Sequence, residues 1–257
     1  MDIFWLKLVL SFFVGGLYVA FTIFLSEKLG SKIGGILLGL PSTTLVSLIF
    51  IYWTQGTETL LLASAIIPAV MAINLFFVIT FISLYNRGIN IAFVSAVLVW
   101  AILALIIVLL NPNLFFSVLV FIFTFGISML LLGKYPHTKL GKIHSSRTEF
   151  TYRSVFAGGV ISSSVLAANY VGAVWGGVLG TFPAAFSSSL YLLSKKHGFA
   201  FASSVAKNIP FGTIGTVIFA ISLSTVSSHF DIVISFIISY LLSLFYAVLV
   251  YFVILKK

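Results

Sequence analysis

Lys207 is the ionisable residue that lies deepest inside an apolar stretch of the sequence. It follows the start of the stretch 199–226 by about nine residues, or ~13 Å along an α-helix. An ammonium group at that depth in a membrane needs a partner, which can be protein, a wet cavity or an anionic solute. We therefore expect Lys207 and its neighbour Asn208 to bind a solute, or Lys207 to carry a proton. The alternative is that Lys207 snorkels to the inner membrane surface.

Four prolines interrupt apolar stretches, and polar residues gather around them. Proline in a helix frees the carbonyl four residues earlier, which in hydrocarbon must be satisfied by protein, water or a solute. The prolines are Pro41, Pro68, Pro183 and Pro210, and the carbonyls are those of Leu37, Ser64, Leu179 and Ala206. The polar residues expected to form a solute cavity with Lys207 and Asn208 are Thr43, Thr44, Asn74, Ser187, Ser188 and Thr216. Alternatively, these prolines are ordinary features of membrane helices, and the hydroxyls cap carbonyls or join helices.

The sequence offers no set of residues for catalysis or metal binding. It has no cysteine, its five acidic residues stand at the ends of apolar stretches or in connections, and its four histidines stand in connections. A Ser-His pair, paired carboxylates or a His-Glu-x-x-His pattern cannot be assembled from them. We therefore predict that the protein is not an enzyme, binds no metal and uses no cofactor.

The composition indicates a polytopic membrane protein. Hydrophobic residues make up 61% of the 257 residues and charged residues 7%, whereas a soluble domain carries about 25% charged residues. A bilayer core needs about 20 apolar residues per helix. The stretches that meet this length are 3–25, 33–53, 58–85, 90–110, 113–133, 152–169, 172–194, 199–226 and 232–254. The predicted fold class is therefore all-α, with about nine transmembrane helices.

Basic residues predict the orientation in the membrane. With the N-terminus outside, the inner connections hold 12 of the 14 Lys and Arg residues, and the outer connections hold none. Because basic residues are retained on the cytoplasmic side, we expect an integral protein of the plasma membrane with its C-terminus in the cytoplasm. The net charge of +9 then reports orientation, and no nucleic acid is expected as a partner.

The second half of the sequence repeats the first at an offset of 142 positions. The matched glycines and prolines are Gly30 with Gly172, Gly34 with Gly176, Gly35 with Gly177, Pro41 with Pro183, Gly56 with Gly198 and Pro68 with Pro210. Because five apolar stretches separate equivalent ones, the two halves enter the membrane in opposite directions, as in many secondary transporters. We predict a first four-helix repeat over 1–110, a connector helix and basic loop over 111–144, and an inverted second repeat over 145–257.

Glycines at four-residue spacing allow helices to approach closely. On that basis Gly34 and Gly35, and their equivalents Gly176 and Gly177, are predicted to pack helices against each other. Such a tight crossing is a candidate pivot between the halves.

The stretch 33–41 reads Ile-Gly-Gly-Ile-Leu-Leu-Gly-Leu-Pro, and Gly56 and Pro68 follow it. This pattern resembles the small GlpM-type membrane proteins, four-span chains with a Gly-Leu-x-x-x-Phe-Pro entry, a later Gly and a Pro in the next helix. Both halves of this chain carry the pattern, with Phe182 at the Phe position of the second half and Leu40 in the first. The resemblance implies two fused four-helix units and implies no particular chemistry.

Together these patterns favour a transporter that moves a small solute, anionic or polar-neutral, by alternating access between inverted repeats. A channel or a lipid-translocating protein is the alternative. An intramembrane enzyme lacks a catalytic set, and an assembly subunit would be favoured if no cavity existed. The expected partners are the lipid bilayer and a small-molecule solute, and a homodimer is left open.

Overall fold

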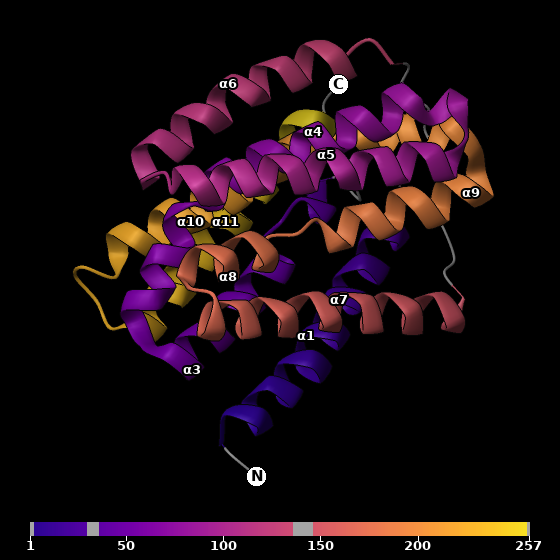
Figure 1. Cartoon of the computed structure of the whole chain (residues 1–257). Helices are drawn as coiled ribbons and strands as arrows, with labels where there is room; N and C mark the ends of the chain where they lie inside the picture. The colour runs from indigo at the N-terminus through magenta and orange to yellow at the C-terminus, as the bar shows by residue number, and fades with distance from the viewer. Residues whose placement is uncertain (1–2, 30–35, 136–145, 256–257) are drawn as a thin grey trace.

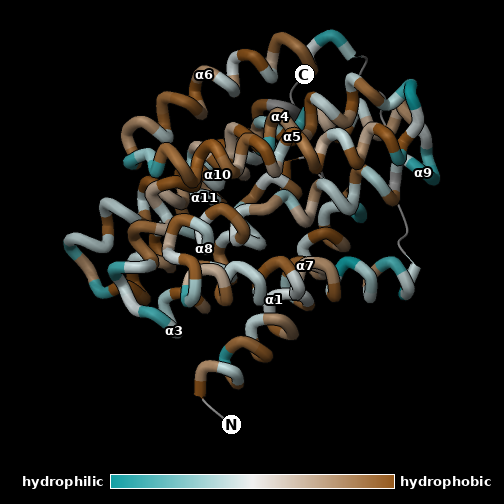
Figure 2. The backbone as a smooth tube through the Cα atoms, in the orientation of Figure 1, coloured by the Kyte–Doolittle hydropathy of each residue, from teal (hydrophilic) through white to brown (hydrophobic). Residues whose placement is uncertain are grey.

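The computed structural model of the chain describes residues 3–29, 36–135 and 146–255, and every regular element in these ranges is a helix. The helices are α1 (Ile3–Lys28), α3 (Ser42–Ala65), α4 (Ile67–Leu84), η1 (Tyr85–Arg87), α5 (Ile89–Leu110), α6 (Leu114–Leu132), α7 (Arg147–Tyr170), α8 (Ala173–Gly180), α9 (Ala184–Ala206), α10 (Ile209–Val226) and α11 (Ile232–Leu255). The turns from α5 to α6 and from α10 to α11 lie at the left of Figure 1, whereas η1 and the start of α7 lie at the right. Figure 2 shows hydrophilic stretches gathered towards the two ends, with apolar stretches between them. The predicted all-α polytopic membrane fold is confirmed.

Seven helical stretches among the described residues are long and apolar enough to cross a membrane by themselves. Those that fail this test are α7, which begins with charged and polar residues, and the pair formed by the short α8 and the serine- and lysine-containing α9. They are the repeat equivalents of α1 and of the stretch Ile36–Ala65, which both pass. The repeat equivalence therefore gives nine passes if these two stretches also cross, and that number stays a prediction.

The repeat is present in the backbone angles. Pro41 (φ −74°, ψ 43°) precedes α3, and Pro183 (φ −74°, ψ 52°) precedes α9. Inside these helices the chain bends at Gly56 (φ 84°, ψ −175°) and at Gly198 (φ 75°, ψ −170°), angles that glycine adopts without the steric cost of a side chain. In Figure 1 α9 extends to the right-hand end and α10 returns to the left, so the chain reverses at the bend.

The tight turns before Pro41 and Pro183 correct one expectation. The carbonyls of Leu37 and Leu179 were expected to lack donors, but they accept from the N–H groups of Leu40 at 3.2 Å and of Phe182 at 3.0 Å. Because the chain turns within three residues at this point, a nearer N–H replaces the donor that the proline lacks.

Pro68 and Pro210 mark the second pair of breaks. Each stands in the first turn of its helix, α4 or α10, where a backbone donor is not needed. The carbonyl of Ser64, also expected to be free, accepts from the backbone N–H of Ile66, which caps α3. All four prolines therefore stand at helix breaks, as predicted, although three of the carbonyls find local donors.

A close crossing joins α1 and α7. A Cβ added to Gly16 would meet the carbonyl oxygen of Ser154, and a Cβ added to Gly158 would meet that of Phe12. Gly158 is the repeat equivalent of Gly16, and Ser154 is that of Phe12. The crossing therefore follows the repeat. The sequence comparison missed this pair because its matches begin at position 30.

A buried ion pair lies at the same interface. Arg153 on α7 and Glu27 on α1 are 2% and 5% exposed, and their side chains are 2.5 Å apart. The sequence placed both in connections or at ends. Removing one partner of such a pair leaves an uncompensated buried charge, so the pair ties α1 to α7.

The crossing predicts different effects for two neighbouring glycines. Gly158→Ala should destabilise the protein by about 1–3 kcal/mol, because the new methyl group overlaps the backbone of α1. Gly159→Ala is the matched control, since nothing lies within 4 Å of its added Cβ. Denaturant unfolding in detergent micelles measures both, and equal stabilities would contradict the close crossing.

Candidate functional site

The two proline breaks face each other across a small cavity, called the central cavity here. Its volume is about 20 Å³, room for one water-sized occupant. It is lined by residues 38–40 and 42–44 of the first break, by 181–183, 185 and 186 of the second, and by Met71, Asn74 and Thr216. None of these lining residues is charged.

Each repeat donates a hydrogen bond to the broken helix of the other. Asn74 on α4 donates from Nδ2 to the carbonyl oxygen of Thr181 at 2.8 Å, and Thr216 on α10 donates from Oγ1 to that of Gly39 at 2.8 Å. Asn74 and Thr216 are equivalent positions, as are Gly39 and Thr181. The two bonds therefore form one interaction, made twice by the repeat, which holds the unwound backbone of both halves at the cavity.

The two hydrogen bonds are not equally supported, because a further side chain, that of Trp100, bonds to Asn74 and not to Thr216. The indole N–H of Trp100 on α5 donates to Oδ1 of Asn74 at 2.7 Å, which fixes the orientation of the amide. The Trp100 ring also packs edge-on against Phe182 at 4.8 Å between ring centroids. Position 242, the equivalent of Trp100, is a leucine, so Thr216 has no comparable support.

The structure brings together only part of the predicted polar set. Thr43, Thr44, Asn74 and Thr216 line the central cavity, whereas Ser187, Ser188 and Asn208 do not. The side chains of Ser187 and Ser188 donate to the carbonyl of Ala184 at 3.4 and 2.7 Å, and Asn208 donates to that of Ser204 at 2.9 Å. These three residues satisfy local helix carbonyls, which was the alternative interpretation.

Lys207 lies apart from the central cavity. Its Nζ donates to the backbone carbonyls of Gly133 at 3.4 Å and Tyr135 at 3.3 Å, just after α6. A cation at the end of a helix is favoured by the partial negative charge of its last carbonyls. The expected place of Lys207 beside the solute is thus corrected, because depth along one helix did not reveal that the long side chain reaches another.

The glycines predicted to pack helices are only partly described. Gly34 and Gly35 lie outside the described residues. A Cβ on Gly176 would meet the Cβ of Ala168 at 2.5 Å, and one on Gly177 would meet the backbone oxygen of Ala63. These glycines bring α8 close to α7 and to α3, so they hold the second break in place.

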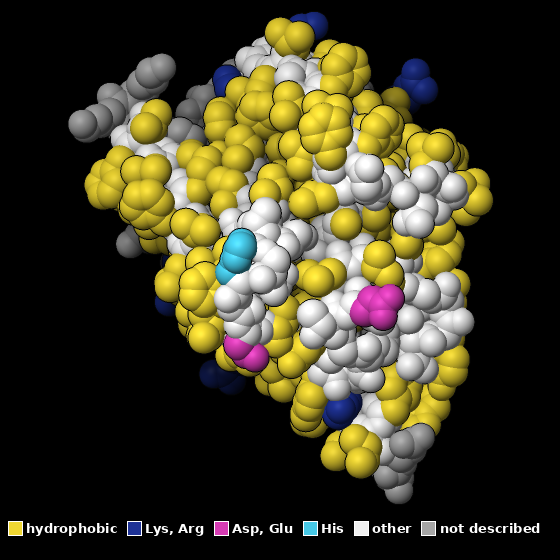
Figure 3. Space-filling view, turned by 90° about the vertical axis from the view of Figure 1, so that its left-hand side faces the viewer, with side chains coloured by type: hydrophobic (Ala, Val, Ile, Leu, Met, Phe, Trp, Pro, Cys, Tyr) yellow, Lys and Arg dark blue, Asp and Glu magenta, His cyan; other side chains and the backbone are white. Residues whose placement is uncertain are grey.

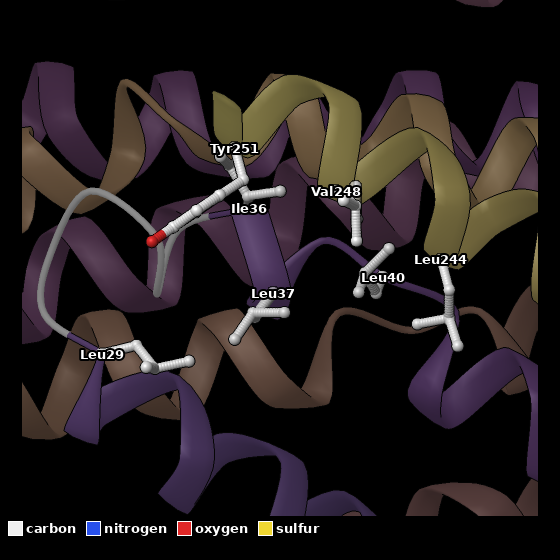
Figure 4. A pocket seen from close by; sticks show the side chains of 8 residues that line it. Leu29, Ile36, Leu37, Leu40, Leu244, Val248 and Tyr251 are labelled. Atoms are coloured by element: carbon white, nitrogen blue, oxygen red, sulfur yellow. The ribbon is translucent and has the colours of Figure 1, made fainter. Parts of the chain in front are cut away.

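Two apolar grooves flank the central cavity. The first, of about 420 Å³, is lined by Leu29, Ile36, Leu37, Leu40, Leu244, Ala247, Val248 and Tyr251. Figure 4 shows its aliphatic side chains from the stretch before Pro41 facing those of α11, with Tyr251 at one end. The second, of about 460 Å³, is lined by Trp100, Val155, Phe156, Gly159, Val160, Ser163, Leu179 and Phe182.

The residue before each break proline separates a groove from the central cavity. Leu40 lines the first groove and the cavity, and Phe182 lines the second groove and the cavity. Leu40 and Phe182 are repeat equivalents. In the sequence this pair stands out only as the variable position of a motif, yet the two side chains form the walls of the site. Sequence reasoning did not identify Thr181, Gly39 or Trp100 as site residues. The offset of 142 positions between Asn74 and Thr216 was the available signal that these two side chains play equivalent roles.

Comparison with known families finds one match, over residues 8–112, to a family model described as a protein of unknown function, DUF3147. No curated protein and no solved structure matches the chain. The matched range runs from α1 into the turn after α5, so it corresponds to the first repeat and to less than half of the chain. The resemblance to GlpM-type proteins is not tested by this match and stays a prediction.

The reciprocal bonds predict that Thr216 matters more than a similar threonine one turn away. Thr216→Val should destabilise the protein by about 1–3 kcal/mol, because the buried carbonyl of Gly39 loses its donor. Thr213→Val is the matched control, since Thr213 is fully buried on the same helix but donates to Pro210 of its own turn. Thermal unfolding in micelles compares the two, and a larger loss in Thr213→Val would contradict the interaction across the repeats.

Proposed function

We propose that the protein is a secondary transporter in which two inverted repeats alternately expose the central cavity to the two sides of the membrane. The observation that carries the proposal is the pair of equivalent hydrogen bonds, from Asn74 to Thr181 and from Thr216 to Gly39. Broken helices that meet at the interface of inverted repeats are the usual site of solute binding in such proteins.

The size and walls of the central cavity fit a closed intermediate of such a cycle. A volume of about 20 Å³ holds no organic solute, so exchange with either side requires the breaks to move apart. The bonds made by Asn74 and Thr216 stand at equivalent positions, and in the proposed cycle one is kept while the other opens. Trp100 supports Asn74 and not Thr216. The bond made by Thr216 should therefore break more easily, so we expect the cavity to open first on the side that Thr216 holds.

The proposal includes an orientation in the plasma membrane, with the N-terminus outside and the C-terminus in the cytoplasm. Figure 3 looks at the end that bears the turns from α5 to α6 and from α10 to α11, and its surface is mainly apolar and uncharged, with acidic and histidine side chains near the middle and basic ones towards the margins. Among the described residues, the opposite end bears η1 and the start of α7 (Figure 1), which contain Arg87 and Arg147, and this supports a cytoplasmic position for that end.

A lipid-translocating protein is the second candidate, and the two apolar grooves favour it. Each groove meets the polar central cavity at one side chain, Leu40 or Phe182. For an acyl chain in a groove to bring its headgroup to the cavity, that side chain must rotate and the breaks must move apart. Protein-dependent bleaching of inner-leaflet fluorescent lipid by dithionite in proteoliposomes would favour this candidate over a carrier.

Alternating access can be tested without knowing the solute, because the sequence contains no cysteine. Ser42 lines the central cavity and is 5% exposed, so Ser42→Cys places one thiol there. We expect a membrane-impermeant maleimide to label it from either side, tested in right-side-out and inside-out vesicles, as the cavity opens in turn to each.

Ser128→Cys, fully buried in α6 and away from the cavity, is the control and should resist labelling from both sides. Labelling of Ser42→Cys from one side only, or from neither, would rule out alternating access.

A further inference from the structure

The first turns of α3 and α9 present free backbone donors to the central cavity. Both helices follow a proline and have no side-chain cap. Among the described residues no hydrogen bond uses the backbone N–H groups of Thr43, Thr44, Ala185 or Phe186. All four residues line the cavity. Two helix N-termini from the two repeats therefore meet at one point with their donors unused.

Three buried hydroxyls at the same place also lack partners. Ser42, Thr43 and Thr44 line the cavity and are 5%, 6% and 4% exposed. In the described part of the chain no hydrogen bond engages their side chains, a state they share with the buried Ser47, Ser189, Ser239 and Ser243. What sets Ser42, Thr43 and Thr44 apart is their position on the cavity wall, which leaves their hydroxyls available to an occupant.

Four backbone carbonyls at the two breaks, in contrast, are occupied. The carbonyls of Thr181 and Gly39 accept from the opposite repeat. Those of Leu40 and Phe182 accept, each at 2.7 Å, from the first N–H group of α3 and of α9. What remains for an occupant is four backbone N–H donors and three hydroxyls that can also donate, and such an excess of donors at two helix N-termini favours an anion.

The charge and size of the site narrow the class of anion. Each helix N-terminus carries a partial charge of about +0.5, so the two together present about +1. No lining residue is charged, and the volume of about 20 Å³ takes a water-sized ion. We infer that the central cavity binds a small monovalent inorganic anion, of the size of a halide, through the N-termini of α3 and α9 and the hydroxyls of Ser42, Thr43 and Thr44.

Anion binding at this site does not depend on transport. Only the statement that this anion is the transported solute rests on the proposed function. It also replaces Lys207 as the anion partner, because that ammonium is held by carbonyls after α6. A site built from dipoles alone holds its ion less tightly than one with a fixed cation, which suits release on the far side.

Anion binding is measured on the purified full-length protein in detergent, in sodium gluconate buffer. Sodium chloride and sodium bromide should give saturable heat in calorimetric titration and raise the melting temperature, and sodium sulfate at equal ionic strength should give neither. No saturable halide binding, or equal binding of sulfate, would overturn the inference.

Substitutions locate the binding. In the double variant Thr43→Val and Thr44→Val, halide affinity should fall about tenfold or more, since each removed hydroxyl is a hydrogen bond to a charged group. Thr124→Val, at a buried position of α6 outside the cavity, should keep the wild-type affinity. Ala185→Val adds volume at the cavity wall without removing a hydroxyl, and it should also weaken binding. It tests the same site if the double variant does not fold. Unchanged affinity in both cavity variants, or loss in Lys207→Gln alone, would contradict the site.

Chloride flux in proteoliposomes separates this inference from the proposed function. Halide binding without protein-dependent chloride exchange would support the site and contradict transport of the anion. Exchange of a neutral solute that is independent of chloride, with no halide binding, would support a transporter and overturn the anion site.

Discussion

The need to satisfy backbone polar groups in an apolar medium shapes the centre of this molecule. Two helical stretches are interrupted by a proline inside the apolar part of the fold, where an unpaired carbonyl or N–H group costs several kcal/mol. Local turns satisfy part of this demand, and the side chains of Asn74 and Thr216 satisfy another part from the opposite repeat. Neither half can complete its own break, so the two halves must interlock at this point.

Pairs of small residues bring the backbones close enough for that interlock. Gly16 and Gly158 bring α1 onto α7, and Gly177 brings α8 onto the backbone of α3. The Gly39 and Gly212 backbones meet in the same way, so that α10 rests directly on the first break. Because each approach leaves no room for a Cβ, the positions of the breaks are set by backbone contact.

Departures from the repeat are as informative as its matches. The repeat equivalent of Asn74 is Thr216, that of Leu40 is Phe182, and that of Trp100 is Leu242. Hydroxyls follow the first proline at Thr43 and Thr44, whereas their equivalents after the second are Ala185 and Phe186. An exact repeat would give two identical halves of a site. This chain instead supplies hydroxyls from one half and mainly backbone donors from the other.

The sequence by itself determined the helical membrane fold, the repeat and the positions of the breaks, because hydropathy, proline and glycine act locally along the chain. It also placed Thr43, Thr44, Asn74 and Thr216 in the site through their proximity to the prolines. Only the tertiary structure decided that Lys207 reaches the end of α6 and that Ser187 and Ser188 bond to their own helix. The direction of a side chain and the acceptor it finds depend on neighbouring helices far away in sequence, and no local pattern encodes them.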